Sequence, residues 1–402
     1  MTPAIGIDSP YAWRRLAVSV AISTLGGIGM WALAVAMPAV QADLGVSRAD
    51  ISFAYSMNML GFFAGGVIVG RLVDRRGIVV ASVVSAFGLG AGFGLSSLTS
   101  SLVLFAAAQV LVGFSAAATF APLVADISHW FEKRRGLAVA IAASGNYIAG
   151  AIWPPIVGLM IRDFGWRTTY ASAAVLCVVA MIPLALTLKR RAPDHEQGSA
   201  AAVAQRSLAA LGLSPNGLQA LLILAGVSCC IAMSMPQVHI VAYCADLGYG
   251  LARGAEMLSL MLGFGIVSRI GTGWLADRVG GAMTLLLGST LQAVALVFYL
   301  VADTLTSLYL ASALFGLFQG GIVPSYAIIV REYFPAREAA TRVGLTVSST
   351  IVGMALGGWM GGVLFDLTGS YRAAFINGIG WNVLNALVAW WLLSRQMRRA
   401  TA

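Results

Sequence analysis

Charged residues are scarce in this chain. Asp, Glu, Lys and Arg make up only 10% of its 402 residues, whereas 59% are hydrophobic. Ordinary soluble domains carry about 25% charged residues. The apolar residues also form long stretches without polar interruption, and this excludes a soluble globular class. The composition instead predicts an all-α protein that crosses a membrane many times.

Cysteine and histidine are few as well, with four and three residues respectively. The cysteines lie in or beside apolar stretches, and their spacing matches neither a disulfide framework nor a zinc site. The glycine-rich segment GLGAGFG, residues 88–94, has no preceding strand, so close helix packing explains it better than phosphate binding. No nucleophile–base pair is evident either. We therefore expect neither an enzyme nor a bound cofactor or metal.

Apolar stretches of about 20 residues are needed to span a bilayer as helices. The sequence contains twelve, near residues 15–37, 52–70, 78–98, 102–127, 136–160, 168–188, 216–243, 255–275, 282–302, 305–330, 341–364 and 372–394. The longest hydrophilic stretch separates the first six from the last six. We predict an N-terminal six-helix bundle over 1–190, a cytoplasmic linker over 191–215 and a C-terminal six-helix bundle over 216–402.

The net charge of +9 raises the question of nucleic acid, but the distribution of the charge argues against it. Short basic clusters follow the ends of apolar stretches. If both termini lie inside, 19 of the 25 Lys and Arg residues fall on the cytoplasmic side. This asymmetry is what membrane insertion favours. We expect a monomer in a bacterial inner membrane, with both termini cytoplasmic and the lipid bilayer as its surroundings.

An internal repeat appears in two short segments, which we call the octets. GRLVDRRG, residues 70–77, and GWLADRVG, residues 273–280, match at five of eight positions with an offset of 203. Two octets at equivalent places indicate a duplicated unit. Glycine permits a tight turn, and the Asp and Arg side chains are suited to latching helix ends during a conformational change. The alternative is a merely tight, charged turn. The candidate gating residues are Gly70, Asp74, Arg75, Gly273, Asp277, Arg278 and, at the edge of the fourth stretch, Asp126.

The octets resemble the loop signature of the major facilitator superfamily, Gly-x-Leu-x-Asp-Arg-x-Gly. The twelve stretches, the central linker and the repeat extend this resemblance over essentially the whole chain. It implies the major facilitator fold, with two six-helix bundles around a central cavity that opens to each side of the membrane in turn.

Arg269 is the most unusual residue in the spans. An arginine at the centre of a span costs about 2.5–3.5 kcal/mol on insertion scales, so it usually faces a partner or a watery cavity. No acidic residue lies three or four positions away. A guanidinium can bind a carboxylate through two hydrogen bonds. We expect Arg269 to bind an anionic substrate, although a side chain that merely reaches the membrane surface remains the structural alternative.

Several other polar residues are candidates for the same cavity. His239 follows Pro236 in the seventh stretch, and histidine is the residue type whose unperturbed side chain changes charge near neutral pH, which suits substrate binding or proton coupling. No Asp or Glu lies deep in any span, so the cavity is expected to favour anions. Packing or interhelical bonding is the alternative for each residue. The remaining candidates for substrate binding are Tyr326, Asn146, Tyr147 and Thr119.

An arginine in the eighth span together with a histidine in the seventh resembles the monocarboxylate transporter branch of the family. There the arginine binds the substrate carboxylate, and Arg269 matches it; His239 matches a histidine that lines the site in bacterial members. Mammalian members carry an aspartate four residues before the arginine, where this chain has Gly265. The resemblance implies transport of a small organic anion such as lactate, with a proton coupled through Arg269 and His239.

Three alternatives remain open at this point. An exchanger of the oxalate–formate type predicts uptake that depends on internal anion and ignores a pH gradient. An efflux carrier predicts resistance phenotypes. A non-transporting receptor would need a signalling domain.

Overall fold

Twelve membrane crossings can be traced in the computed structural model, which describes residues 6–190, 213–302 and 304–400. Ten helices in these ranges are long and apolar enough to span a membrane. Two of them, α7 (Arg135–Leu186) and α10 (Leu251–Val301), each turn at one glycine, Gly165 or Gly280, and so supply two crossings apiece. Every regular element in these ranges is a helix, which confirms the predicted all-α fold.

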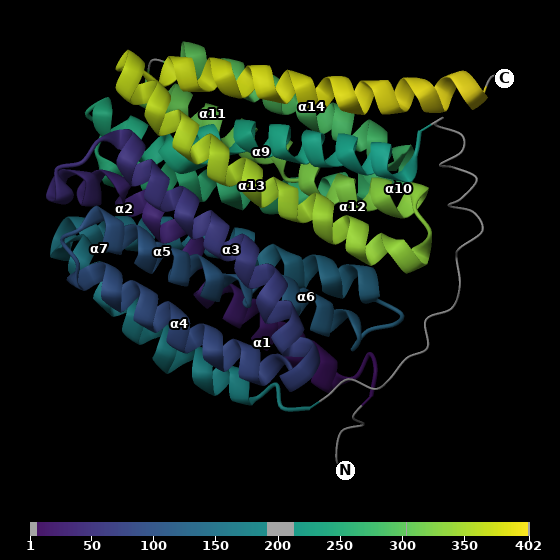
Figure 1. Ribbon diagram of the computed structural model, residues 1–402, viewed down its shortest axis with the longest axis horizontal. Helices are drawn as coiled ribbons and strands as arrows, with labels where there is room; N and C mark the ends of the chain where they lie inside the picture. The colour runs from purple at the N-terminus through teal and green to yellow at the C-terminus, as the bar shows by residue number, and fades with distance from the viewer. Residues whose placement is uncertain (1–5, 191–212, 303, 401–402) are drawn as a thin grey trace. The chain divides into compact units, whose positions relative to one another are not determined.

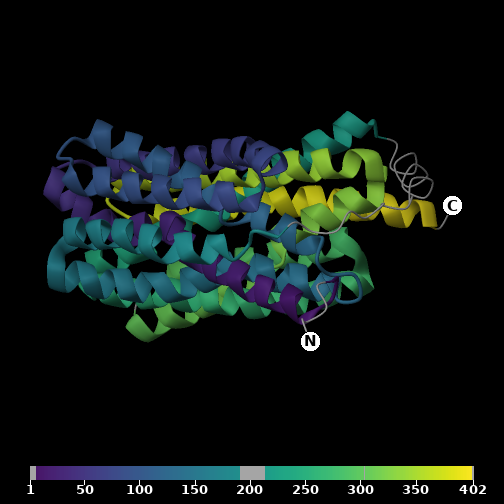
Figure 2. The ribbon, with the colours of Figure 1, turned by 90° about the horizontal axis from the view of Figure 1, so that it is seen from below.

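The remaining helices follow in chain order (Figures 1 and 2). They are α1 (Pro10–Gly26), α2 (Ile28–Leu44), α3 (Arg48–Arg76), α4 (Ile78–Leu98), α5 (Leu102–Ala117), α6 (Ala121–Ser128), α9 (Pro215–Asp246), α11 (Leu305–Gln319), α12 (Ile322–Tyr333), α13 (Ala336–Thr368) and α14 (Tyr371–Ala400).

The helices extend beyond the predicted apolar stretches. The helix α3 begins at Arg48, four residues before the predicted start, because Ser47 and Asp50 form a capping box at its N-terminus. In this motif the Ser47 side chain accepts from the Asp50 amide and the Asp50 side chain accepts from the Ser47 amide. Hydropathy marks only the part of a helix that lies in hydrocarbon, so polar first turns escape it.

Three crossings are broken where hydropathy predicts continuous helices. Gly27 separates α1 from α2, residues 118–120 separate α5 from α6, and residues 320–321 separate α11 from α12. The ends of α5 and α11 are 202 residues apart, close to the offset of the octets. Pro122, in the first turn of α6, lacks the N–H that a continuous helix would need. The duplication seen in the octets therefore extends to a matching break in the fourth and tenth crossings.

The last glycine of each octet adopts a backbone conformation that is essentially restricted to glycine. Gly77 has φ 85° and ψ 167°, and Gly280 has φ 78° and ψ 169°. An L side chain at these angles clashes with its own backbone. After Gly280 the chain restarts as a helix, and the Gly281 amide donates to Glu332 Oε1 at 2.9 Å. The octets thus form equivalent turns, and we call the end of each unit that carries its octet the octet end.

The chain divides into two compact units. The first contains α1 to α7 together with Val241–Leu262, and the second contains the rest of α9 and α10 with α11 to α14. Within the first unit, α3 packs mainly against α5, and α4 packs mainly against α7. Most of the predicted linker lies outside the described residues, and the division at 190 and 216 stays a prediction.

Candidate functional site

Thr119 lies at a meeting point of two helix breaks in the first unit. It follows the end of α5, it is only 2% exposed, and its hydroxyl donates to the Ala116 carbonyl at 2.7 Å. Its side chain packs directly against Gly26, the last residue of α1, where a Cβ atom would collide with it. The breaks in the first and fourth crossings are therefore in contact through this pair.

Asn146 and Tyr147 lie on α7 near the same break. The Asn146 side-chain nitrogen contacts Met30 Sδ at 3.5 Å, and the backbone carbonyl oxygen of Asn146 accepts from Trp31 Nε1 at 3.2 Å. Tyr147 is buried, with 7% of its surface exposed. A second indole, Trp153 Nε1, donates to the Thr24 carbonyl at 2.6 Å. We did not predict a role for either tryptophan, although an indole N–H in an apolar stretch signals that a buried acceptor must lie nearby.

Arg269 lies in the first half of α10 and is the only charged residue between positions 257 and 276. It is half-buried, and it stands between Ser268, which is 4% exposed, and Ile270, which is 65% exposed. The buried side of this helix contacts the break between α11 and α12. Arg269 thus stands at the edge of a packed interface of the second unit.

Two glycines allow this close approach. A Cβ atom on Gly320 would lie 2.5 Å from the Gly265 carbonyl oxygen and 2.7 Å from the Ser268 Cβ. A Cβ atom on Gly321 would collide with Thr272. Gly265 lies four residues before Arg269, and its backbone packs on the break.

Two buried polar atoms on either side of this contact have no hydrogen-bond partner among the described residues. They are the hydroxyl of Ser268 and the side-chain nitrogen of Gln319, the last residue of α11. Gln319 is fully buried, and its oxygen accepts from Gln237 Nε2 at 2.8 Å. Leaving such a group unsatisfied costs about 1–3 kcal/mol, so each one calls for an explanation. The bond between Gln237 and Gln319 joins α9 to the end of α11.

His239 lies inside the second unit, against α13 and α14. Its Nε2 lies 2.8 Å from the Gly358 carbonyl oxygen, and the ring leaves no room for a Cβ on Gly361. The Tyr371 ring is tilted against it at 5.3 Å between centroids. The histidine is fully buried. These contacts place it on the α13 side of α9, whereas Gln237 faces the α11 side.

The Tyr326 hydroxyl belongs to a polar network that joins three helices. It donates to Asn385 Oδ1 at 2.8 Å, and Asn385 Nδ2 donates to Ser289 Oγ at 2.7 Å. Asn382 adds a bond of 2.6 Å to the Ser289 carbonyl. Asn382 and Asn385 of α14 thus bond to α10 and, through Tyr326, to α12. Tyr326 itself is fully buried in the same network.

The candidate gating residues fall at the octet ends. Arg278 is exposed, and its guanidinium carbon lies 3.3 Å from the centroid of the Trp274 ring. Gly70 and Gly273 have open space around the position of a Cβ, and the side chain of Asp74 lies outside the described residues. Arg75 and Asp277 are exposed. Asp126 instead forms a buried ion pair with Arg15, which the sequence did not suggest.

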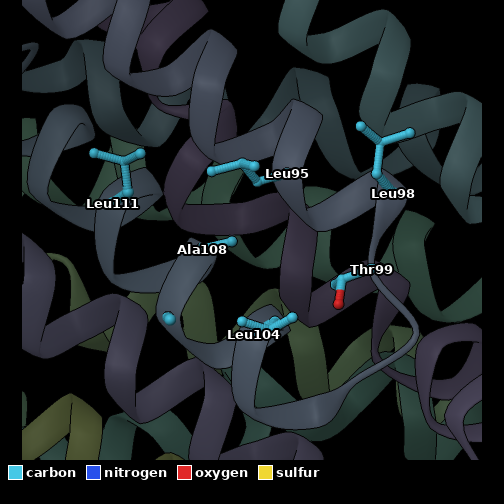
Figure 3. Close-up of a pocket in the computed structure, with 7 residues that line it drawn as sticks. Leu95, Leu98, Thr99, Leu104, Ala108 and Leu111 are labelled. Atoms are coloured by element: carbon cyan, nitrogen blue, oxygen red, sulfur yellow. The ribbon is translucent and has the colours of Figure 1, made fainter.

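A groove of about 390 Å³ between α4 and α5 contains none of these candidates (Figure 3). Its lining is apolar apart from Thr99. Leu98 and Leu104 there are 83% and 62% exposed, as expected for side chains that face lipid. We therefore do not place the functional site in this groove.

Twelve crossings in two units, with Arg269 inside an apolar span, are typical of a polytopic membrane transport protein. The sequence profile of the Major Facilitator Superfamily matches residues 20–307 and 256–401, and the chain belongs to that family. The resemblance predicted from the octets is thereby confirmed.

Named relatives come from animals and from fungi. Monocarboxylate transporter 13 of Rattus norvegicus is 27% identical over 333 residues, which cover 81% of this chain and 74% of that protein. Monocarboxylate transporter 11 of Homo sapiens is 28% identical over 400 residues, covering 93% and 81%. Among solved structures, a bacterial homolog of the human lysosomal transporter Spinster, in an inward-facing and occupied conformation, matches with a TM-score of 0.76. It is 14% identical over 96% of this chain and 97% of that chain, so this likeness concerns the fold alone.

Proposed function

We propose that this protein is a secondary transporter of small monocarboxylate anions, and that Arg269 binds the carboxylate. The observation that carries the proposal is the half-buried arginine in a span that has no other charge between positions 257 and 276. An arginine is tolerated at such a depth when it serves a substrate pathway. The relatives named as monocarboxylate transporters support the choice of anion.

Transport follows from the charge of Arg269. A bound carboxylate neutralises the guanidinium, which lowers the cost of closing apolar walls around it. An empty carrier keeps a positive charge inside an apolar span, so its change of conformation is slower. A proton that enters with the anion, or on His239, makes the cycle a symport. We place both termini on the cytoplasmic side of a bacterial inner membrane, in keeping with the distribution of Lys and Arg.

Uptake of radiolabelled lactate into proteoliposomes tests this proposal, with and without an inward proton gradient. Arg269→Gln removes the charge and is expected to raise KM by about 10–100-fold, since a hydrogen bond to a charged group contributes about 1.5–3 kcal/mol. Arg253→Gln is the matched control. Arg253 belongs to the same helix, but it forms an exposed ion pair with Glu256 at 3.0 Å. Uptake by Arg269→Gln equal to that of Arg253→Gln would overturn the assignment of the anion site.

The same vesicles separate symport from the alternatives. Symport requires that the proton gradient stimulates uptake. An exchanger is instead stimulated by internal anion and is indifferent to the gradient, and an efflux carrier of larger compounds takes up no lactate under either condition.

A further inference from the structure

Cys229 and Cys230 are adjacent residues of α9 whose thiols lie together in the interior of the second unit. Their Sγ atoms are 3.8 Å apart, and the two residues are 0% and 2% exposed. The other two cysteines of the chain, Cys177 and Cys244, belong to the first unit. The proposed transport function uses neither thiol of the pair, so the pair is free to serve another chemistry.

Two neighbouring helices surround this pair. The Cys229 thiol adjoins Tyr326 of α12, and the Cys230 thiol adjoins Thr350 of α13. A Cβ atom on Gly353 of α13 would lie 2.9 Å from the Cβ of Cys230, so the two helices pack tightly here. A group bound to both sulfurs therefore lies between helices of the second unit and not in the surrounding lipid.

The distance between the sulfurs decides what can join them. Consecutive Cα atoms are about 3.8 Å apart, whereas the Cα atoms of a disulfide are usually about 4.4–6.8 Å apart, so a direct bond would distort the helix. A single atom bound to both sulfurs avoids this distortion. A tetrahedral ion with bonds of about 2.3 Å holds two sulfurs about 3.8 Å apart, and this is the distance observed between Cys229 and Cys230.

The number of ligands narrows the choice of the bridging atom. Structural zinc sites use four protein ligands. No group of three or more His, Cys, Asp or Glu side chains that could hold a metal ion occurs in the part of the chain that the structure describes. A trivalent arsenic atom that already carries one organic group needs only two further ligands. Arsenic is a soft centre and thiolates are soft ligands, so two adjacent thiols complete its coordination.

We propose that Cys229 and Cys230 form a binding site for monosubstituted trivalent arsenicals at the contact of α9 with α13. With phenylarsine oxide, two As–S bonds form, the bond between arsenic and oxygen breaks, and the two thiol protons leave with the oxygen as water. Arsenic stays trivalent, so the step needs no oxidant or reductant. The second As–S bond is intramolecular, so the cyclic product resists exchange with a monothiol and yields only to a dithiol. This inference does not depend on Arg269.

The mass of the intact, purified chain after exposure to phenylarsine oxide tests the site. Exposure continues until the mass is constant, because buried thiols react as the structure opens locally. The wild type is expected to retain one phenylarsenic group per chain in about a tenfold excess of 2-mercaptoethanol over the arsenical, and to lose it to 2,3-dimercaptopropanol. Digestion is expected to place the group on the peptide that contains both Cys229 and Cys230.

Cys229→Ala and Cys230→Ala are each expected to lose the retained group, because a single thiol forms only one As–S bond. The matched control is the double variant with Cys177→Ala and Cys244→Ala. It also removes buried thiols, but it leaves the pair intact. This control should retain one phenylarsenic group, as the wild type does.

Absence of a retained group on the wild type overturns the site, and so does its loss from the control variant or its retention by either single variant. If the single variants do not fold, as shown by their elution from a sizing column, the peptide that carries the group in the wild type decides, and attachment to Cys177 or Cys244 overturns the site.

The melting temperature of the modified wild type gives an independent readout. Because Gly353 leaves no room beside Cys230, the bound group is expected to push α13 away and to lower the melting temperature. Treatment with 2,3-dimercaptopropanol should restore the original value. A melting temperature that the bound group leaves unchanged would overturn the placement of the site at this contact.

Discussion

The guanidinium of Arg15 and the carboxylate of Asp126 form a buried ion pair with two hydrogen bonds, at 2.7 and 2.8 Å. Arg15 is 2% exposed, and it also donates to the carbonyl oxygens of Leu188 and Arg190, at 3.1 and 3.0 Å. Trp130 covers its flat face, with 4.8 Å between the guanidinium carbon and the ring centroid. This one side chain joins α1, α6 and the end of α7 at the octet end of the first unit.

Asp126→Asn is therefore expected to destabilise the protein by about 3–5 kcal/mol, because it leaves a buried arginine without its counter-charge. Thermal unfolding of the protein in detergent measures the effect. Asp163→Asn is the control, since Asp163 pairs with Arg162 on the exposed surface and its loss should change stability little. Equal melting temperatures for the two variants would show that the buried pair contributes nothing.

The contact of Gly320 with α10 predicts a second effect. Gly320→Ala places a methyl group 2.5 Å from the Gly265 carbonyl oxygen, so one of the two helices must move. Overpacking of this kind costs about 1–3 kcal/mol, and the shift displaces the segment that carries Arg269. We expect a lower melting temperature together with reduced uptake. Gly271→Ala is the control, because Gly271 lies on α10 with open space at the Cβ position. It should lower neither the melting temperature nor the uptake. A loss of uptake in this variant equal to that of Gly320→Ala would argue against close packing as the cause.

The turns after the octets predict a third effect. Gly77→Ala and Gly280→Ala force an alanine to adopt φ 85° or φ 78° with an extended ψ. A strained backbone of this kind costs about 1–3 kcal/mol. Gly66→Ala, within the helix α3 and with no atom within 4 Å of the Cβ position, should be neutral or slightly stabilising. Thermal unfolding of the three single variants compares them, and similar melting temperatures would show that the turns relax without strain.

Hydropathy predicted the crossings well, because a continuous run of about twenty apolar residues can satisfy its backbone hydrogen bonds in lipid only as a helix. It could not predict the break at Gly320 and Gly321, because these residues are apolar and fit the pattern of a continuous span. Gly320 and Gly321 leave room for the close approach of α10, which is a property of packing. Pro122 was visible in the sequence, and it gave the one local signal for a break in the fourth crossing.

The candidate site was predictable where a residue is unusual by its own chemistry, as Arg269 is. Ser268 and Gln319 are ordinary residues in the sequence, separated by 51 positions. Their buried polar atoms without a hydrogen-bond partner are a property of the packed structure, which no pattern along the chain records. Asp126 stands out by its charge, but its partner Arg15 is 111 residues away, and no pattern along the chain joins the two.

The tip of α9 offers a test of movement. Asp246 ends this helix and pairs with Arg48 of α3 at 3.2 Å, while Arg48 Nε donates to Gln41 Oε1 at 2.5 Å. Arg48 is 5% exposed. Although most of α9 belongs to the second unit, its tip belongs to the first, so these bonds hold the tip in place. Any motion that separates the tip of α9 from the first unit must break them.

Cys244, two residues before Asp246 and fully buried, reports on this motion. In a variant whose other three cysteines are replaced by serine, Asp246→Asn is expected to speed labelling of Cys244 by a maleimide about fivefold, because a half-exposed ion pair contributes about 1 kcal/mol. Exchanging the charges, with Arg48→Asp and Asp246→Arg together, should return labelling towards the original rate. Asp163→Asn, which removes a different exposed carboxylate, should leave it unchanged. Faster labelling in the exchanged pair as well would mean that the side chains merely shield the thiol, and the ion pair would then have no part in holding α9.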